Sequence, residues 1–209
     1  MKGLILKDLY MAKKYFRNYI FILILFLGLS FSSQDSLFLV FYPGLLCAMI
    51  PVNLLAYDER SHWDIYCGAL PVTRDMVVSS KYLFGLMIQG IVYLLTGALQ
   101  ALRIGLAGPF DWDSFLVLMA LLWMVFLLSS SITLPFMFRL GVEKGRMAYY
   151  VMIGVVCGSA VIAGGLFDSQ LDAAIPFNAA LLAGCLVSAG IFAGSWYLSI
   201  LFYRRRELN

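Results

Sequence analysis

Six long apolar segments divide the chain, and they constrain its fold more than any other feature. The segments are Tyr19–Ser33, Ser36–Tyr57, Tyr82–Leu102, Ser114–Phe138, Ala148–Phe167 and Ile175–Phe202. None of them carries Asp, Glu, Lys or Arg in its interior. Since a helix needs about 20 mainly apolar residues to cross the hydrocarbon core of a bilayer, each segment predicts one transmembrane helix. The sequence therefore predicts an all-α integral membrane protein with six transmembrane helices.

The composition excludes the other broad classes. Of the 209 residues, 62% are hydrophobic and 13% are charged, whereas a soluble domain carries about 25% charged residues. Disordered chains are poor in aromatic residues, and 15% of this chain is aromatic. No hydrophilic stretch has room for a separate soluble domain, so we expect residues 1–209 to form one membrane domain.

The basic residues give the predicted helices an orientation. All of the 15 lysines and arginines except Arg103 lie in the N-terminal segment, in the connections after the second and fourth apolar segments, or at the C-terminus. The connections on the opposite side carry aspartates instead: Asp35, Asp111, Asp113, Asp168 and Asp172. By the positive-inside rule, both termini are expected in the cytoplasm.

Residues 1–18 predict an amphipathic helix that lies in the inner membrane interface. At 100° per residue, most of its apolar residues share one half of the helix and its five basic residues share the other half. Asp8, Leu6 and Tyr10 break this pattern. A cleaved signal peptide is the alternative, because Ser30–Ser32 has small residues at the positions of a cleavage site. The 18 residues before the apolar run are long for the charged region of a signal peptide, so we favour the uncleaved helix.

The apolar segments lack the groups that intramembrane chemistry needs. Proton-driven transporters place Asp, Glu or His within the bilayer, and the single histidine, His62, lies in a cytoplasmic connection. The chain has no phosphate-binding loop and no hydrolase motif, and none of its cysteines has metal-ligand spacing. We expect no catalytic residue, no metal and no cofactor in this chain. Uphill transport would require a partner that supplies the energy.

One polar stripe crosses the third apolar segment. Its residues follow helical spacing on one face: Gln89, Tyr93, Thr96 and Gln100. Buried amides and hydroxyls need partners within a bilayer, so this face must contact protein or water. The stripe either lines a translocation path or forms hydrogen bonds between helices.

The last two apolar segments contain pairs of small residues that allow helix backbones to approach closely. The pairs are Gly154 with Gly158 and Gly190 with Gly194. Such faces serve helix packing within one chain and contact between two subunits equally well, and both alternatives stay open.

Residues 58–80 form the largest polar connection. Its apolar residues follow helical spacing and predict a short helix that Gly68 would close: Trp63, Tyr66, Cys67 and Leu70. Pro71 then predicts an extended turn. Thr73 is a suitable N-cap for the next helix, which would enter the membrane at Lys81.

These pieces resemble the membrane subunits of type-2 ATP-binding-cassette (ABC) export permeases, especially the short bacterial ones. The matching pieces are Leu6-Lys7-Asp8, Glu59, Leu70-Pro71-Val72-Thr73-Arg74, Lys81-Tyr82 and Tyr203-Arg204-Arg205-Arg206-Glu207. The resemblance covers most of the chain. It implies that residues 58–80 contain the coupling helix that contacts a separate ATP-binding subunit.

The resemblance also implies which residues contact that subunit: Glu59, Trp63, Leu70, Pro71 and Arg74. It implies a homodimer or heterodimer of permeases in a bacterial plasma membrane, with ATP and Mg²⁺ bound by the partner and no nucleic acid involved. The expected substrates are drugs, peptides or other amphiphiles. The loop Asp168–Ala174 is short, so we do not expect a substrate-binding ectodomain.

Two other functions remain open. The first is the substrate-capturing membrane subunit of a vitamin importer, which has a similar size and number of helices. The second is a channel or scaffold that works without an ATPase.

Overall fold

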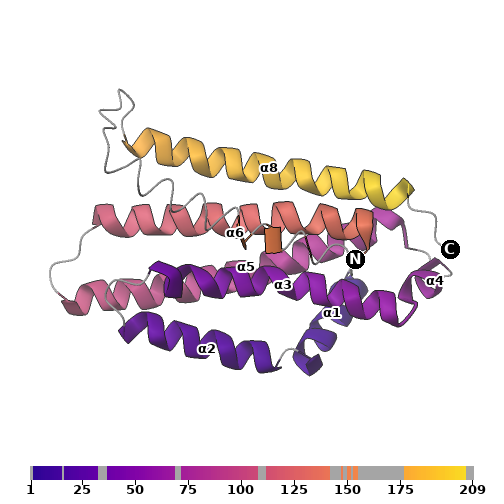
Figure 1. The fold of residues 1–209 in the computed structure, drawn as a ribbon, viewed down its shortest axis with the longest axis horizontal. Coiled ribbons are helices and arrows are strands. Elements are labelled where there is room, and N and C mark those ends of the chain that lie inside the picture. Colours follow the sequence, from indigo (N-terminus) through magenta and orange to yellow (C-terminus); the bar gives the residue numbers. More distant parts are fainter. Residues whose placement is uncertain are drawn as a thin grey trace.

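The computed structural model describes residues 2–15, 17–32, 37–68, 72–107, 112–141, 147, 150–151, 153–154 and 177–205. The elements of this part are helices: α1 (Lys2–Tyr15), α2 (Arg17–Ser32), α3 (Leu37–Arg60), α4 (Trp63–Gly68), α5 (Arg74–Ala107), α6 (Trp112–Leu140) and α8 (Phe177–Arg205). Figure 1 shows the long helices side by side, with α4 at one end of the bundle. The predicted all-α class is confirmed for the described residues.

The long helices coincide with the predicted spans where the chain is described. Four of them, α3, α5, α6 and α8, are long and apolar enough to cross a membrane, whereas the apolar run of α2 is shorter, at Tyr19–Ser30. The predicted span Ala148–Phe167 lies largely outside the described residues. The structure is thus that of a multi-pass membrane protein, and the count of six spans stays a prediction.

Helix α5 begins well before the apolar segment that predicted it. It starts at Arg74 and contains 34 residues, a length of about 50 Å at 1.5 Å per residue. A hydrocarbon core is about 30 Å thick, so the first turns of α5 project beyond the span on the side of α4. The Thr73 carbonyl accepts hydrogen bonds from the backbone amides of Met76 and Val77. Thr73 therefore occupies the predicted N-cap position.

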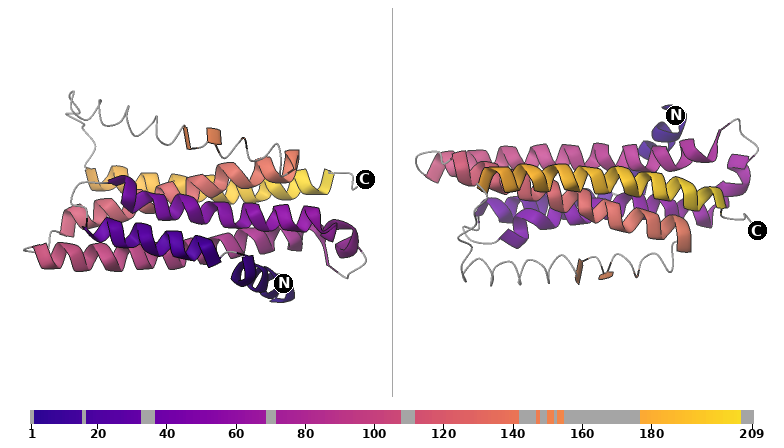
Figure 2. Two further views of the ribbon diagram at one scale, coloured as in Figure 1. Left: turned by 60° about the horizontal axis from the view of Figure 1, so that its bottom comes forward. Right: turned by 90° about the horizontal axis from the view of Figure 1, so that it is seen from above.

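Helix α3 lies at the centre of the described bundle and packs against α2, α5 and α6. Helix α8 packs against α6 and α5. Gly44 of α3 faces the Phe126 ring of α6 so closely that a Cβ atom would overlap it. Figure 2 shows α1 at an angle to the long helices, beside the bundle and just beyond the end of α2; it contacts α2, α3 and α5.

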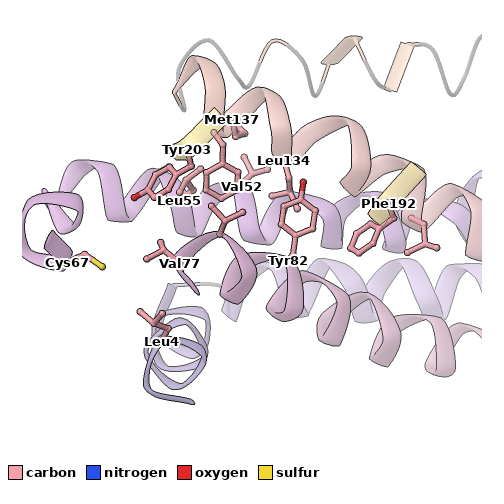
Figure 3. Packing of buried hydrophobic residues seen from close by; sticks show 14 residues of the cluster. Leu4, Val52, Leu55, Cys67, Val77, Tyr82, Leu134, Met137, Phe192 and Tyr203 are labelled. Atoms are coloured by element: carbon pink, nitrogen blue, oxygen red, sulfur yellow. The ribbon is translucent and has the colours of Figure 1, made fainter. Parts of the chain in front are cut away.

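The largest apolar cluster lies toward the α4 end. Figure 3 shows Leu4 of α1, Cys67 of α4 and Val77 of α5 at one end of this cluster, with Phe192 of α8 at the other. Side chains from six described helices, α1, α3, α4, α5, α6 and α8, therefore meet here. This packing positions the polar groups of the same region.

Candidate functional site

Four charged side chains meet where the middle of α1 contacts the end of α3 and the N-terminal part of α5. We call Lys7, Asp8, Asp58 and Lys81 the ionic cluster. The Lys81 ammonium lies 2.7 Å from Asp8 Oδ1 and 2.7 Å from Asp58 Oδ2. The Lys7 ammonium lies 2.7 Å from Asp58 Oδ1 and 3.5 Å from Asp8 Oδ1. With two cations and two anions, the formal charges of the cluster balance.

Most of the ionic cluster is removed from solvent. Asp8, Asp58 and Lys81 are 0%, 3% and 1% exposed, and only the Lys7 side chain, at 23%, has appreciable exposure. Buried charges are costly unless they are paired, so each member depends on the others. Asp8 Oδ2 is also buried and has no hydrogen-bond partner among the described residues. Removal of one member would therefore leave a buried charge uncompensated.

Helix α4 stands beside the ionic cluster. The Lys7 ammonium lies 4.2 Å from the centroid of the Trp63 ring, within cation–π range. Cys67 is buried in the apolar cluster, whereas Tyr66 is 62% exposed. The predicted short helix is present and ends at Gly68. The Tyr66 ring packs against the Trp63 ring, with centroids 5.4 Å apart, but most of its surface remains exposed. Helix α4 thus places the Trp63 ring against Lys7 of the ionic cluster and leaves the adjacent Tyr66 ring largely exposed.

A tight turn sets the direction of α4. His62 has a φ of 51°, in the left-handed region, between the end of α3 and the start of α4. The Ser61 amide donates to the Tyr57 carbonyl at 3.0 Å, and the Ser61 hydroxyl donates to the Asp58 carbonyl at 3.1 Å. These bonds satisfy carbonyls at the end of α3. The turn places α4 only one turn of chain after Asp58, the member of the ionic cluster that α3 contributes.

Lys81 and Tyr82 anchor α5 on two sides. Lys81 reaches α1 and α3, whereas the Tyr82 hydroxyl lies 2.7 Å from Ser199 Oγ and 2.9 Å from Ser195 Oγ of α8. The Tyr82 ring stacks on Trp196 at a centroid distance of 5.6 Å. Adjacent residues of a helix point about 100° apart, which explains why this pair reaches different neighbours.

The first turn of α5 is also joined to the last turn of α8. Arg74 Nη1 donates to the Arg204 carbonyl at 3.0 Å, and Arg204 Nε donates to Asp75 Oδ1 at 2.7 Å. A second bond joins Arg204 Nη2 to Asp75 Oδ2. This forked contact is exposed, so it contributes less to stability than the buried ionic cluster.

Of the five residues expected to contact an ATP-binding subunit, three are described in the structure. Glu59 and Trp63 are half-buried on either side of the turn at His62, and Arg74 is exposed at the start of α5. Leu70 and Pro71 lie outside the described residues. Their contact with a partner stays a prediction.

The polar stripe of α5 lies inside the chain. Gln89 Nε2 donates to the Phe126 carbonyl of α6 at 3.0 Å, and Gln100 Nε2 donates to Ser30 Oγ of α2 at 2.8 Å. Thr96 is fully buried. The Tyr93 ring meets the Trp123 ring of α6 edge-on, with centroids 5.7 Å apart. Gln89 and Gln100 thus form hydrogen bonds between helices, whereas Thr96 Oγ1 has no hydrogen-bond partner among the described residues. The role of the stripe in a translocation path stays a prediction.

The described members of the two glycine pairs lie on the surface of the chain and not in its packed interior. Gly190 and Gly194 are exposed on α8, and a Cβ atom at either position would meet no atom within 4 Å in the described structure. Gly154 is exposed as well, and Gly158 lies outside the described residues. Their contact with a second permease stays a prediction.

The sequence pattern did not single out the ionic cluster as a site. Lys7, Asp8 and Lys81 belonged to the family resemblance, Lys81 also marked where a helix enters the membrane, and Asp58 was part of a polar connection; nothing in the pattern joined the four. One signal was present, because Asp8 falls on the apolar half of the first helix. A carboxylate on an apolar face requires a buried cation, but the sequence does not tell which lysine supplies it.

The comparisons with known proteins agree with this architecture. The family described as ABC-2 family transporter protein matches residues 3–204. Neither a curated protein nor a solved structure matches the chain. The family match begins in α1 and ends in α8, so it includes every member of the ionic cluster. The chain therefore belongs to the ABC-2 transporter family and is a membrane permease of an ABC transporter.

Proposed function

We propose that this permease exports a drug, a peptide or another amphiphile, and that α4 is the coupling helix that receives the movement of an ATP-binding subunit. The ionic cluster is the observation that carries the proposal. It joins α1, α3 and α5 through buried ion pairs, and Lys7 of the same cluster contacts Trp63 of α4.

A push on α4 would move several helices together. Trp63 and Cys67 attach α4 to the bundle, so α4 has little freedom to move alone. The buried ion pairs make separation of α1, α3 and α5 costly. Closure of the ATP-binding subunits would then shift these helices as a unit and favour one of two permease conformations.

Tyr66 is the best candidate for direct contact with the ATP-binding subunit. It is 62% exposed on a helix whose other aromatic residue faces the bundle. Exposed tyrosines are enriched where one protein surface binds another. Glu59 and Arg74 lie near the ends of the same connection and complete the proposed contact surface.

The test is co-purification of the permease with the ABC ATPase encoded beside it, followed by measurement of ATPase activity. We expect Tyr66→Ala to reduce the amount of ATPase bound per permease. Tyr197→Ala is the matched control, because Tyr197 is 64% exposed on α8, away from α4. If Tyr66→Ala and the double variant Glu59→Ala/Arg74→Ala both kept full binding and ATP-dependent transport, α4 would not be the coupling helix.

The direction of transport and its dependence on ATP need a second assay. In inside-out vesicles that contain the complex, an exporter accumulates a fluorescent amphiphilic cation only when ATP is present. A channel would release a trapped dye from liposomes that contain the permease alone. A vitamin importer subunit would bind its ligand tightly in detergent without the ATPase. Either of the last two results would contradict the proposed function.

A further inference from the structure

A partly open apolar cavity of about 490 Å³ lies between α1, α2, α3 and α5. Its walls include Leu23 of α2, Cys47 and Ile50 of α3, and Ile88 and Val92 of α5. Tyr19 also borders the cavity, and its hydroxyl accepts a hydrogen bond from Asn53 Nδ2 at 3.0 Å. The walls therefore favour a hydrocarbon occupant over a polar one.

The cavity has the depth of one membrane leaflet. Along α5 its lining extends from Phe84 to Leu95, a rise on the order of 16 Å at 1.5 Å per residue. That is roughly half of a hydrocarbon core of about 30 Å. Leu9 and Ala12 of α1 border it at the end nearest the ionic cluster. An acyl chain that extends from the interface to the bilayer midplane matches this depth.

The outer rim of the cavity is exposed on the single chain. Ile20 of α2 is 54% exposed, and Ile91 and Leu95 of α5 are 55% and 47% exposed. In contrast, Cys47 and Phe84 in its inner wall are each 1% exposed. The cavity thus opens sideways between α2 and α5, in the direction from which a lipid chain can enter.

Lys13 is the charged residue of the lining. It is exposed on α1, and within the described part of the chain it has no ion pair or hydrogen bond. The apolar stem of Lys13 lines the cavity, and its flexible side chain can bring the ammonium group to the rim. There the ammonium would complement a phosphate attached to a hydrocarbon chain. Because lipid tails are as apolar as the cavity wall, the headgroup must supply the selectivity.

We infer that this cavity binds one acyl chain of an anionic phospholipid, with the lipid phosphate at Lys13. The orientation expected from the basic residues places this lipid in the cytoplasmic leaflet. The inference does not depend on the coupling role of α4, because binding requires only the permease. The lipid would fill the space between α1 and the spanning helices and hold α1 against the bundle.

The test uses the purified permease with phosphatidylglycerol or phosphatidylcholine and counts bound lipids by native mass spectrometry. One basic residue near an anionic membrane surface corresponds to about a fivefold preference. We expect that preference for phosphatidylglycerol in the unmodified protein and its loss in Lys13→Gln. Lys14→Gln removes the same charge from the next residue, which does not line the cavity, and should keep the preference.

A second pair of variants tests the cavity itself. Ile88→Trp fills it from α5 and should abolish retention of the bound lipid, as should Val92→Phe if the tryptophan variant fails to fold. Leu94→Trp is the control, because Leu94 is 69% exposed on the same helix and does not line the cavity. Equal retention of both lipids, retention by the filled variants, or a bound non-lipid molecule would each overturn the inference.

Discussion

Lys81→Met removes a buried cation that lies 2.7 Å from a carboxylate oxygen of both Asp8 and Asp58. Methionine preserves much of the length of the lysine side chain, so the main effect is the loss of charge. The formal charge of the ionic cluster falls from zero to minus one. Lys7 remains as its only cation, 3.5 Å from Asp8 Oδ1.

The size of the stability loss in Lys81→Met follows from the burial of the ion pair. Lys81 is 1% exposed and Asp8 is 0% exposed, so solvent cannot compensate the carboxylate that loses its partner. Removal of one partner from a buried ion pair costs about 3–5 kcal/mol. Replacement of a whole pair by apolar residues is often neutral or stabilising. The double variant Lys81→Met/Asp8→Leu should therefore recover most of the stability that Lys81→Met loses.

The measurement is a double-mutant cycle on the free energy of unfolding of the permease in detergent. Lys81→Met and Asp8→Leu are measured alone and together, and we expect a coupling energy of at least about 2 kcal/mol. Arg204→Met is the control, because it breaks the exposed contact with Asp75 and should change stability much less.

Additive effects would refute this reasoning. If Lys81→Met and Asp8→Leu each destabilised the protein but their costs simply summed, the two side chains would not form an ion pair. A cost for Lys81→Met no larger than that for Arg204→Met would likewise show that Lys81 is solvated. If these variants kept their stability but the permease no longer stimulated the ATPase, the ionic cluster would serve coupling and not stability.

Three further substitutions test local features by thermal unfolding. Gly44→Ala should cost about 1–3 kcal/mol, because its Cβ atom would overlap the Phe126 ring, and Phe126→Leu should relieve the loss. His62→Val should cost about 1–2 kcal/mol because of the left-handed backbone, whereas His62→Gly should cost nothing, and equal effects would contradict a strained turn. Tyr82→Phe should cost about 1 kcal/mol through loss of the hydroxyl's bonds to Ser199 and Ser195, and an unchanged midpoint would show that these bonds contribute nothing.

Much of the fold was predictable because its signals are local. A run of apolar residues long enough to cross a bilayer predicts a helix whatever surrounds it. The start of α5 after Thr73 and the end of α4 at Gly68 also follow from local backbone chemistry. These features need no knowledge of which helices pack together.

The site was less predictable because its members come from distant parts of the chain. The sequence determined that Asp8 lies on an apolar helix face and that the polar face of α5 requires partners. Only the tertiary structure decided that Asp8 pairs with Lys81, 73 positions away, and that Gln100 donates to Ser30 of α2. Helical periodicity specifies which face of each helix is buried, but the partner on the opposing face depends on how the helices pack. The ionic cluster exists because that packing brings two lysines and two aspartates together away from water.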